Sequence, residues 1–122
     1  MGNSEKYDKL CEMLPQVAQD ALETLRHHFT CYIVVPHHDY RTAFSKLVQD
    51  AFIQAGFSID RASSGKVIGE ECTVFIQAIS ADGYRGIVTD AAVLPTSEGL
   101  SPRQIKIMAS LRPSLVGKMY DY

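Results

Sequence analysis

Residues 30–35 read Thr-Cys-Tyr-Ile-Val-Val, and residues 36–41 continue Pro-His-His-Asp-Tyr-Arg. The first six residues are β-branched, aromatic or apolar, which is typical of a strand covered on both faces. We therefore expect a central strand of a sheet at 30–35. Pro36 ends this strand because proline has no N–H to donate to the ladder. Asp39 is well placed to cap a helix over residues 40–55.

Helical spacing of apolar residues flanks this strand on both sides. Before it, apolar residues recur at helical intervals through residues 4–28, and Pro15 interrupts the stripe without changing its register. A proline in a helix interior breaks or kinks the helix. We therefore predict either one kinked helix or two helices nearly in line, with Pro15 in the first turn of the second. After the strand, Gly56 fits a glycine C-cap for the helix at 40–55.

The middle of the chain is predicted to be a meander of antiparallel strands. We expect strands at 57–62, at 66–80 and at 84–93, with Gly69 as a β-bulge in the second. The Ala-Asp-Gly sequence at 81–83 indicates a hairpin between the second and third strands.

The C-terminal segment begins with a well-formed helix start. Ser101-Pro102-Arg103-Gln104 combines a serine cap, a proline at the first helical position and a glutamine three residues after the cap. The helix ends or breaks at Pro113, and we expect a short final helix or tail from there to residue 122.

Together these elements predict a single α+β domain over residues 1–122. A helical N-terminal segment at 1–28 packs on the sheet, one strand-helix-strand crossover and a three-strand meander follow, and residues 101–122 form a helical C-terminal segment. We expect a mixed or antiparallel sheet of about four strands.

The overall composition limits the class of protein. The chain has 122 residues, of which 46% are hydrophobic and 21% charged, and its formal net charge is −2. This composition is that of a folded domain without a strong field for nucleic acid. No apolar run approaches the roughly 20 residues of a membrane span. The three cysteines are widely spaced and the N-terminus is polar, so we expect a cytoplasmic protein with reduced thiols.

The four histidines form two pairs, His27-His28 and His37-His38, on either side of the central strand. Adjacent side chains on extended backbone point to opposite faces, so we expect neither pair to chelate a metal and predict no metal or cofactor. The second pair follows the carboxyl end of the strand, where open sheets bind ligands, and precedes a helix start, which favours anions. His38 and Arg41 are therefore candidate ligand-binding residues.

The charges are unevenly distributed along the chain. Residues 1–25 carry five acids against two lysines, a net −3, whereas residues 101–119 carry four basic residues and no acid, a net +4. Three interpretations remain open: two solvated faces, terminal helices that meet within a chain or across a dimer, and a basic helix that faces an anionic ligand. Arg112 falls in the apolar sector of the last helix and needs a carboxylate, carbonyls, water or a ligand as partner. The further candidate ligand-binding residues are Arg103 on that helix and Tyr84 and Arg85 at the predicted hairpin tip.

These features favour a non-catalytic binding or regulatory protein. We expect it to bind or sequester a partner protein or a small anionic, nucleotide-like ligand, as a homodimer. A phage or mobile-element inhibitor, which works by sequestering its target, is one form of this expectation. The alternative is a small hydrolase or phosphate-transfer enzyme, with His37 or His38 as acid–base and Arg41 or Arg112 as anion clamp. Nucleic-acid binding through the basic last helix is the weakest reading. An enzyme is less favoured because the sequence contains no complete catalytic motif.

Overall fold

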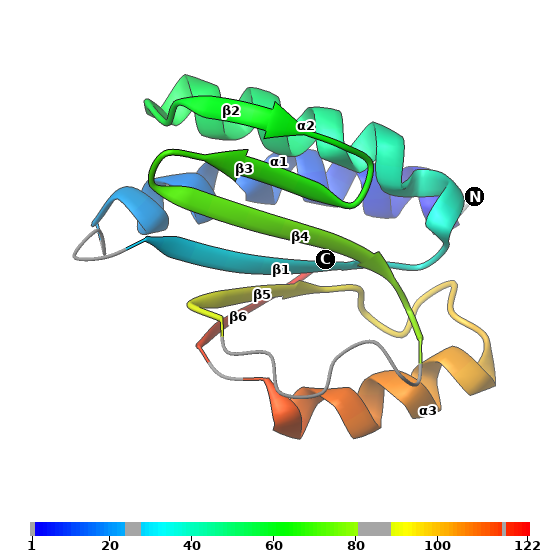
Figure 1. Cartoon of the computed structure of the whole chain (residues 1–122). Coiled ribbons are helices and arrows are strands. Elements are labelled where there is room, and N and C mark those ends of the chain that lie inside the picture. Colours follow the sequence, from blue (N-terminus) through cyan, green and yellow to red (C-terminus); the bar gives the residue numbers. More distant parts are fainter. Residues whose placement is uncertain (1, 24–27, 81–88, 116) are drawn as a thin grey trace.

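In the computed structural model, which describes residues 2–23, 28–80, 89–115 and 117–122, a six-stranded mixed sheet carries helices on both faces (Figure 1). The helices are α1 (Gly2–Glu23), α2 (Arg41–Ala55) and α3 (Pro102–Leu111), with short 3-10 helices η1 (His38–Tyr40) and η2 (Arg112–Ser114). The strands are β1 (Phe29–Val35), β2 (Ile59–Ala62), β3 (Lys66–Gly69), β4 (Cys72–Ala78), β5 (Ala91–Leu94) and β6 (Lys118–Asp121). Their order in the sheet is β2-β3-β4-β1-β5-β6. The predicted α+β class with a mixed sheet is confirmed, and the expected strand count of about four is too low.

Strand β1 lies in the centre of the sheet, as predicted. It pairs in parallel with β4 on one side and with β5 on the other. Cys31 and Ile33 face one core, beneath α1 and α2, whereas Tyr32 and Val34 face a second core, beneath α3. All four side chains are fully buried, because helices cover both faces of the sheet at this strand.

Helix α1 runs through Pro15 as one helix, the first of the two predicted alternatives. Its buried stripe includes Leu10, Leu14 and Val17, and Pro15 itself is exposed. The proline therefore removes a backbone hydrogen bond on the solvent side while the apolar side continues without interruption. The described part of the helix ends at Glu23, and residues 24–27 of the predicted 4–28 helix lie outside the described residues.

The predicted meander exists, but it is formed by different residues. The expected long strand at 66–80 is a hairpin of β3 and β4, which pair antiparallel, and β2 completes the meander beside β3. Gly69 ends β3 rather than forming a bulge; the register shift lies in β2, between Ile59 and Arg61. A Cβ on Gly69 would lie 2.2 Å from the carbonyl oxygen of Ser58. The glycine is therefore needed for the close approach of two backbones.

The predicted return strand at 84–93 is also corrected. Residues 81–88, which include the predicted hairpin turn, lie outside the described residues. The strand that follows, β5, does not return antiparallel beside β4 but lies parallel to β1 on its other side. All four of its residues are buried, which suits an interior parallel strand better than the end of a meander.

The end of the chain forms a strand instead of the expected short helix or tail. After Pro113 ends α3 through η2, Gly117 turns the chain with a φ of 107°, and β6 pairs in parallel with β5. Tyr122 holds this segment in place, because the residue is 1% exposed and its ring packs edge-on against Phe44 of α2. Its hydroxyl donates to the carbonyl of Val34 at 2.5 Å. Among the described residues, no helix has the length and apolar character that crossing a membrane requires.

Candidate functional site

The carboxyl ends of four parallel strands, β1, β4, β5 and β6, lie at the same edge of the sheet. The chain leaves β1 into α2 and leaves β5 into α3, and these two helices lie on opposite faces of the sheet (Figure 1). Neighbouring parallel strands whose helices leave to opposite sides create the point at which open sheets bind ligands. The residues after Val35 of β1 therefore occupy the position where the fold favours a ligand.

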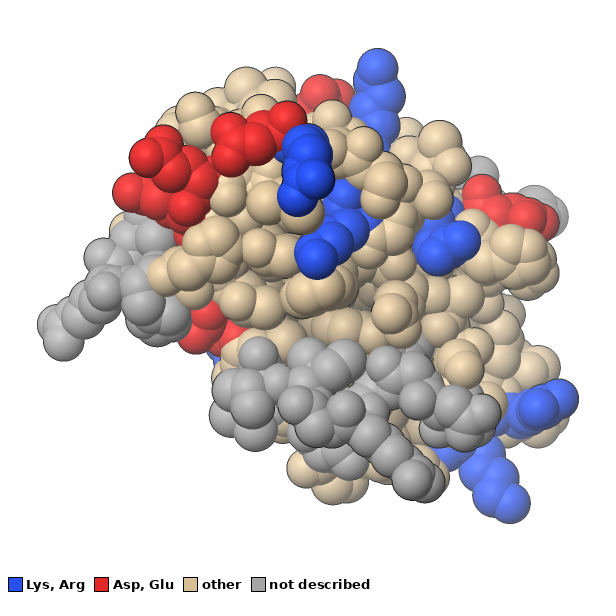
Figure 2. Space-filling view, viewed as in Figure 1, with Lys and Arg blue, Asp and Glu red and all other residues tan. Residues whose placement is uncertain are grey.

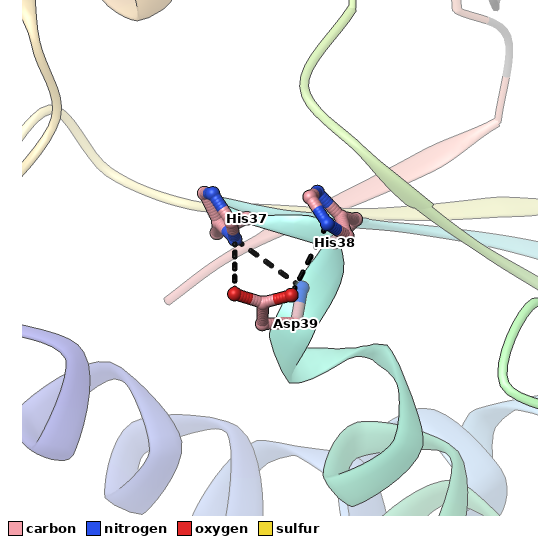
Figure 3. Close-up of side chains that lie close together, drawn as sticks. All are labelled: His37, His38 and Asp39. Atoms are coloured by element: carbon pink, nitrogen blue, oxygen red, sulfur yellow. Dashed lines mark hydrogen bonds and ion pairs between the residues drawn. The ribbon is translucent and has the colours of Figure 1, made fainter.

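His37, His38 and Asp39 follow β1 at this edge and contact one another (Figure 3). The carboxylate oxygens of Asp39 lie 3.2 Å from Nδ1 of His37 and 3.1 Å from Nε2 of His38. The side chains are 53%, 65% and 72% exposed in sequence order. The cluster is therefore open to solvent and to a ligand.

The prediction that adjacent histidines point to opposite faces is wrong for this pair. The two rings stack, with centroids 4.4 Å apart and an interplanar angle of 28°. The reason is local: His37 has extended backbone, with φ −148° and ψ 144°, but the chain turns into η1 at His38. The alternation of side chains on a strand no longer holds there, so both rings come to the same side, above Asp39.

The prediction that Asp39 caps the helix is also wrong. His37 acts as the cap of η1, because its Nδ1 accepts the backbone N–H of Asp39 at 3.3 Å. Tyr40, the residue before α2, makes no side-chain capping bond. The carboxylate of Asp39 is thereby free to contact the two imidazoles.

The start of α3 is tied to the same edge through Gln104. The predicted capping box is present: the Ser101 hydroxyl accepts the Gln104 N–H at 3.2 Å, and the Gln104 side chain accepts the Ser101 N–H at 2.9 Å. The Gln104 amide also donates to the carbonyl of Pro36 at 2.8 Å. One side chain thus caps α3 and fixes the backbone immediately before His37.

Lys6 is a buried cation at this edge that the sequence analysis missed. It is 3% exposed, and its Nζ donates to the carbonyl and hydroxyl of Thr96, both at 3.0 Å, and to the backbone oxygen of Tyr122 at 3.4 Å. Burial lowers the pKa of the Lys6 ammonium. Its position four residues before Leu10, on the apolar stripe of α1, is the signal that could have identified it. Two of these bonds join α1 to the segment after β5, and the third joins it to the residue after β6.

The predicted ligand-binding residues that the structure describes lie at different places in the fold. Arg112 binds a carboxylate of its own chain, with its Nη2 2.6 Å from Oδ1 of Asp121. Arg103 is exposed on α3. Arg41 is half-buried at the start of α2, with Nη1 3.5 Å from where a Cβ on Gly65 would lie. Its buried Nε has no hydrogen-bond partner among the described residues. His38 lies at the sheet edge, and the predicted residues Tyr84 and Arg85 lie outside the described residues.

The two oppositely charged ends of the chain meet through α1 and β6. Helices α1 and α3 lie on opposite faces of the sheet (Figure 1), so the terminal helices do not meet within the chain. Instead, Asp20 of α1 contacts Lys118 of β6, 2.8 Å from its Nζ. On the face shown in Figure 2, Lys and Arg side chains stand in separate groups, some over the strands and others at α3.

A hollow lined mainly by polar residues lies between α2 and the β2–β3 hairpin, away from the histidine pair. It has a volume of about 400 Å³ and is lined by Thr42, Ser45, Lys46, Gln49, Asp50 and residues 62–64. The Ser45 hydroxyl donates to the carbonyl of Ser63 at 2.7 Å and accepts the Gln49 amide at 3.3 Å. These bonds connect the helix to the hairpin and already use the buried polar group of the hollow.

No protein-family model matches the chain, and no curated protein shows significant sequence similarity to it. The geometry of the sheet edge therefore carries the functional assignment.

Proposed function

We propose that this is a small binding or regulatory protein that holds an anionic, nucleotide-like ligand at the carboxyl edge of its sheet, beside His37 and His38. The observation that carries the proposal is the stacked, exposed histidine pair at the switch point between β1 and β5. The N-termini of α2 and α3 lie at this same edge, and the positive end of each helix macrodipole favours an anion there. Imidazole N–H groups supply further donors to phosphate oxygens.

Binding without catalysis is supported by the positions of the two arginines that an enzyme would need as clamps. Arg112 is occupied by Asp121, and the guanidinium of Arg41 lies against Gly65 of the β2–β3 hairpin. Neither contact is to the histidine pair. On the face shown in Figure 2 the described basic side chains form separate groups, which favours a small ligand over nucleic acid at this face.

A titration with ADP tests this proposal. We expect nuclear magnetic resonance shifts to centre on residues 36–40 and on Gln104, and we expect the H37N/H38N double variant to bind at least about tenfold more weakly, a loss of about 1.4 kcal/mol. H28N is the matched control, because His28 is exposed at the opposite end of β1, where its Nε2 contacts the Thr73 hydroxyl at 2.7 Å. Equal affinity of wild type and double variant, or no binding of ADP, would overturn the proposal.

Homodimerisation in the cytoplasm is the second part of the proposal. Among the described residues, β2 and β6 are the edge strands of the sheet, whose outer backbone groups a second copy can cover. Ile53, Ile105 and Met119 are exposed apolar side chains. The three cysteines are free, and burial raises the pKa of Cys31 to about 12 and that of Cys72 to about 11. Such protonated thiols suit a reducing compartment. Native mass spectrometry measures the subunit number and any retained ligand, and a purely monomeric spectrum at micromolar concentration would contradict the dimer.

A further inference from the structure

We propose that His37, His38 and Asp39 bind one divalent transition-metal ion of the Zn²⁺ class. This inference rests on the proposed function and deepens it, because the ion would be the group that receives the anionic ligand. The three residues offer two imidazole nitrogens and a carboxylate oxygen within 4.8 Å of one another.

The contacts of the Asp39 carboxylate with each imidazole are close to the ligand separations around one ion. Tetrahedral zinc binds histidine nitrogen and carboxylate oxygen at about 2.0–2.1 Å, which places neighbouring ligand atoms about 3.3 Å apart. One oxygen of the Asp39 carboxylate lies 3.2 Å from Nδ1 of His37, the other lies 3.1 Å from Nε2 of His38, and one donor atom from each residue gives a set within 4.8 Å. Rotation of these exposed side chains would bring the three donors closer around one ion.

The contacts of His37 Nδ1 show what a metal ion would displace at this place. This nitrogen accepts the backbone N–H of Asp39 at 3.3 Å, which uses its lone pair, and it also lies 3.2 Å from the carboxylate. It cannot accept from one and donate to the other at the same time. An imidazole nitrogen has one lone pair, so a metal ion at Nδ1 would replace the long hydrogen bond from the Asp39 N–H, and the adjacent carboxylate would supply a second ligand.

The donor set also selects the class of metal. Imidazole ligands favour zinc, copper, nickel and iron, whereas Mg²⁺ and Ca²⁺ prefer sites made of oxygen. Three protein ligands leave at least one position for water or another ligand, as in open zinc sites. Because the three side chains are 53–72% exposed, that position faces solvent.

The charge of the ion removes an obstacle to anion binding. Without a metal, the carboxylate of Asp39 places a negative charge beside the imidazoles that would contact a phosphate. A divalent ion held by two neutral imidazoles and one carboxylate leaves the site with a net charge of about +1. The open coordination position then attracts an anionic oxygen.

Isothermal titration of the chelator-treated full chain with Zn²⁺, and visible spectroscopy with Co²⁺, test the site. We expect one ion per chain. D39N and H38N should each weaken binding at least about tenfold, because even the loss of a partner that only orients a ligand costs 10–100-fold. H28N should bind as the wild type does, and circular dichroism checks that each variant is folded. Unchanged Zn²⁺ affinity in H37N/H38N/D39N, or no binding by the wild type, would overturn the site.

A second titration with AMP, with Zn²⁺ or with EDTA, separates this inference from the proposed function. Tighter AMP binding in Zn²⁺ supports both. Zn²⁺ binding through the three residues without any AMP binding keeps the metal site and overturns the proposed anion-binding function. If AMP binds through the histidines with equal affinity in Zn²⁺ and in EDTA, the proposed function stands. The inference that the metal ion binds the anionic ligand is then overturned.

Discussion

At the scale of single residues, Asp20 shows how a side chain gains its role from distant partners. In the sequence it is one of several acids on an amphipathic helix. In the structure its carboxylate accepts bonds from Lys118 at 2.8 Å, the Tyr120 hydroxyl at 2.5 Å and the Gln16 amide at 2.8 Å. The bonds from Lys118 and Tyr120 lower the pKa of Asp20 from 3.8 to about 2. This carboxylate therefore fastens α1 to β6.

The pH dependence of stability follows from the lowered pKa of Asp20. Because the folded-state pKa lies below the unfolded value, the carboxylate stabilises the fold fully above about pH 4, and this contribution is lost as the pH falls toward 2. D20N should lower the free energy of unfolding at pH 6 by about 1–3 kcal/mol. The difference between wild type and D20N, measured by urea unfolding, should shrink between pH 4 and pH 2.

The control for this prediction is E12Q, which changes an exposed acid on the same helix. It should leave the stability within about 0.5 kcal/mol of the wild type. If the stabilities of wild type and D20N fall in parallel as the pH drops, Asp20 is not the group responsible.

At the scale of elements, α1 shows that packing can outweigh local propensity. A proline in a helix interior costs about 3 kcal/mol relative to alanine, yet α1 continues through Pro15. Leu10, Leu14 and Val17 are buried against the rest of the core on both sides of the proline. The free energy of burying this face exceeds the cost of the missing hydrogen bond, since tertiary packing supplies most helical stability in proteins.

Replacing Pro15 by alanine should therefore stabilise the protein. The substitution restores an N–H that can donate to the carbonyl of Cys11, and because Pro15 is exposed it removes no core packing. We expect P15A to raise the free energy of unfolding by about 1–3 kcal/mol in denaturant titrations. P113A is the control. It should raise the free energy of unfolding less than P15A does, since Pro113 is exposed in the first turn of η2, where proline is tolerated. An unchanged or lower stability of P15A would show that α1 packs around a bend that requires the proline.

At the scale of the whole molecule, β6 completes the sheet and connects its layers. The strand pairs with β5, and Tyr122 after it packs on α2 while bonding to β1. The backbone of Tyr122 also bonds to the end of β5 and to the segment after it: its N–H donates to the carbonyl of Leu94, and its oxygen accepts the N–H of Thr96. The segment therefore belongs to the cooperative core of the fold.

Removing the Tyr122 side chain should destabilise the whole molecule. We expect Y122A to lower the free energy of unfolding by about 3–5 kcal/mol, because a fully buried aromatic ring is lost. The control is M119A in β6, the strand that Tyr122 follows. It should lower the free energy of unfolding by less than about 1 kcal/mol, since Met119 is 37% exposed. Hydrogen exchange should show loss of protection in both β5 and β6 for Y122A. A stability loss of Y122A no larger than that of M119A would contradict this account.

The sequence by itself determined the features that depend on a few neighbouring residues: the buried strand β1, the left-handed cap at Gly56 and the capping box of α3. It also identified His37 and His38 as candidate residues at the end of β1. The tertiary structure alone decided the direction of β5, the existence of β6, and the pairing of Asp20 with Lys118 and of Arg112 with Asp121. It also brought the two imidazoles together over Asp39. The physical reason is range: periodicity and capping act over one or two turns, whereas strand order and ion pairs depend on which distant segments the closed core brings together.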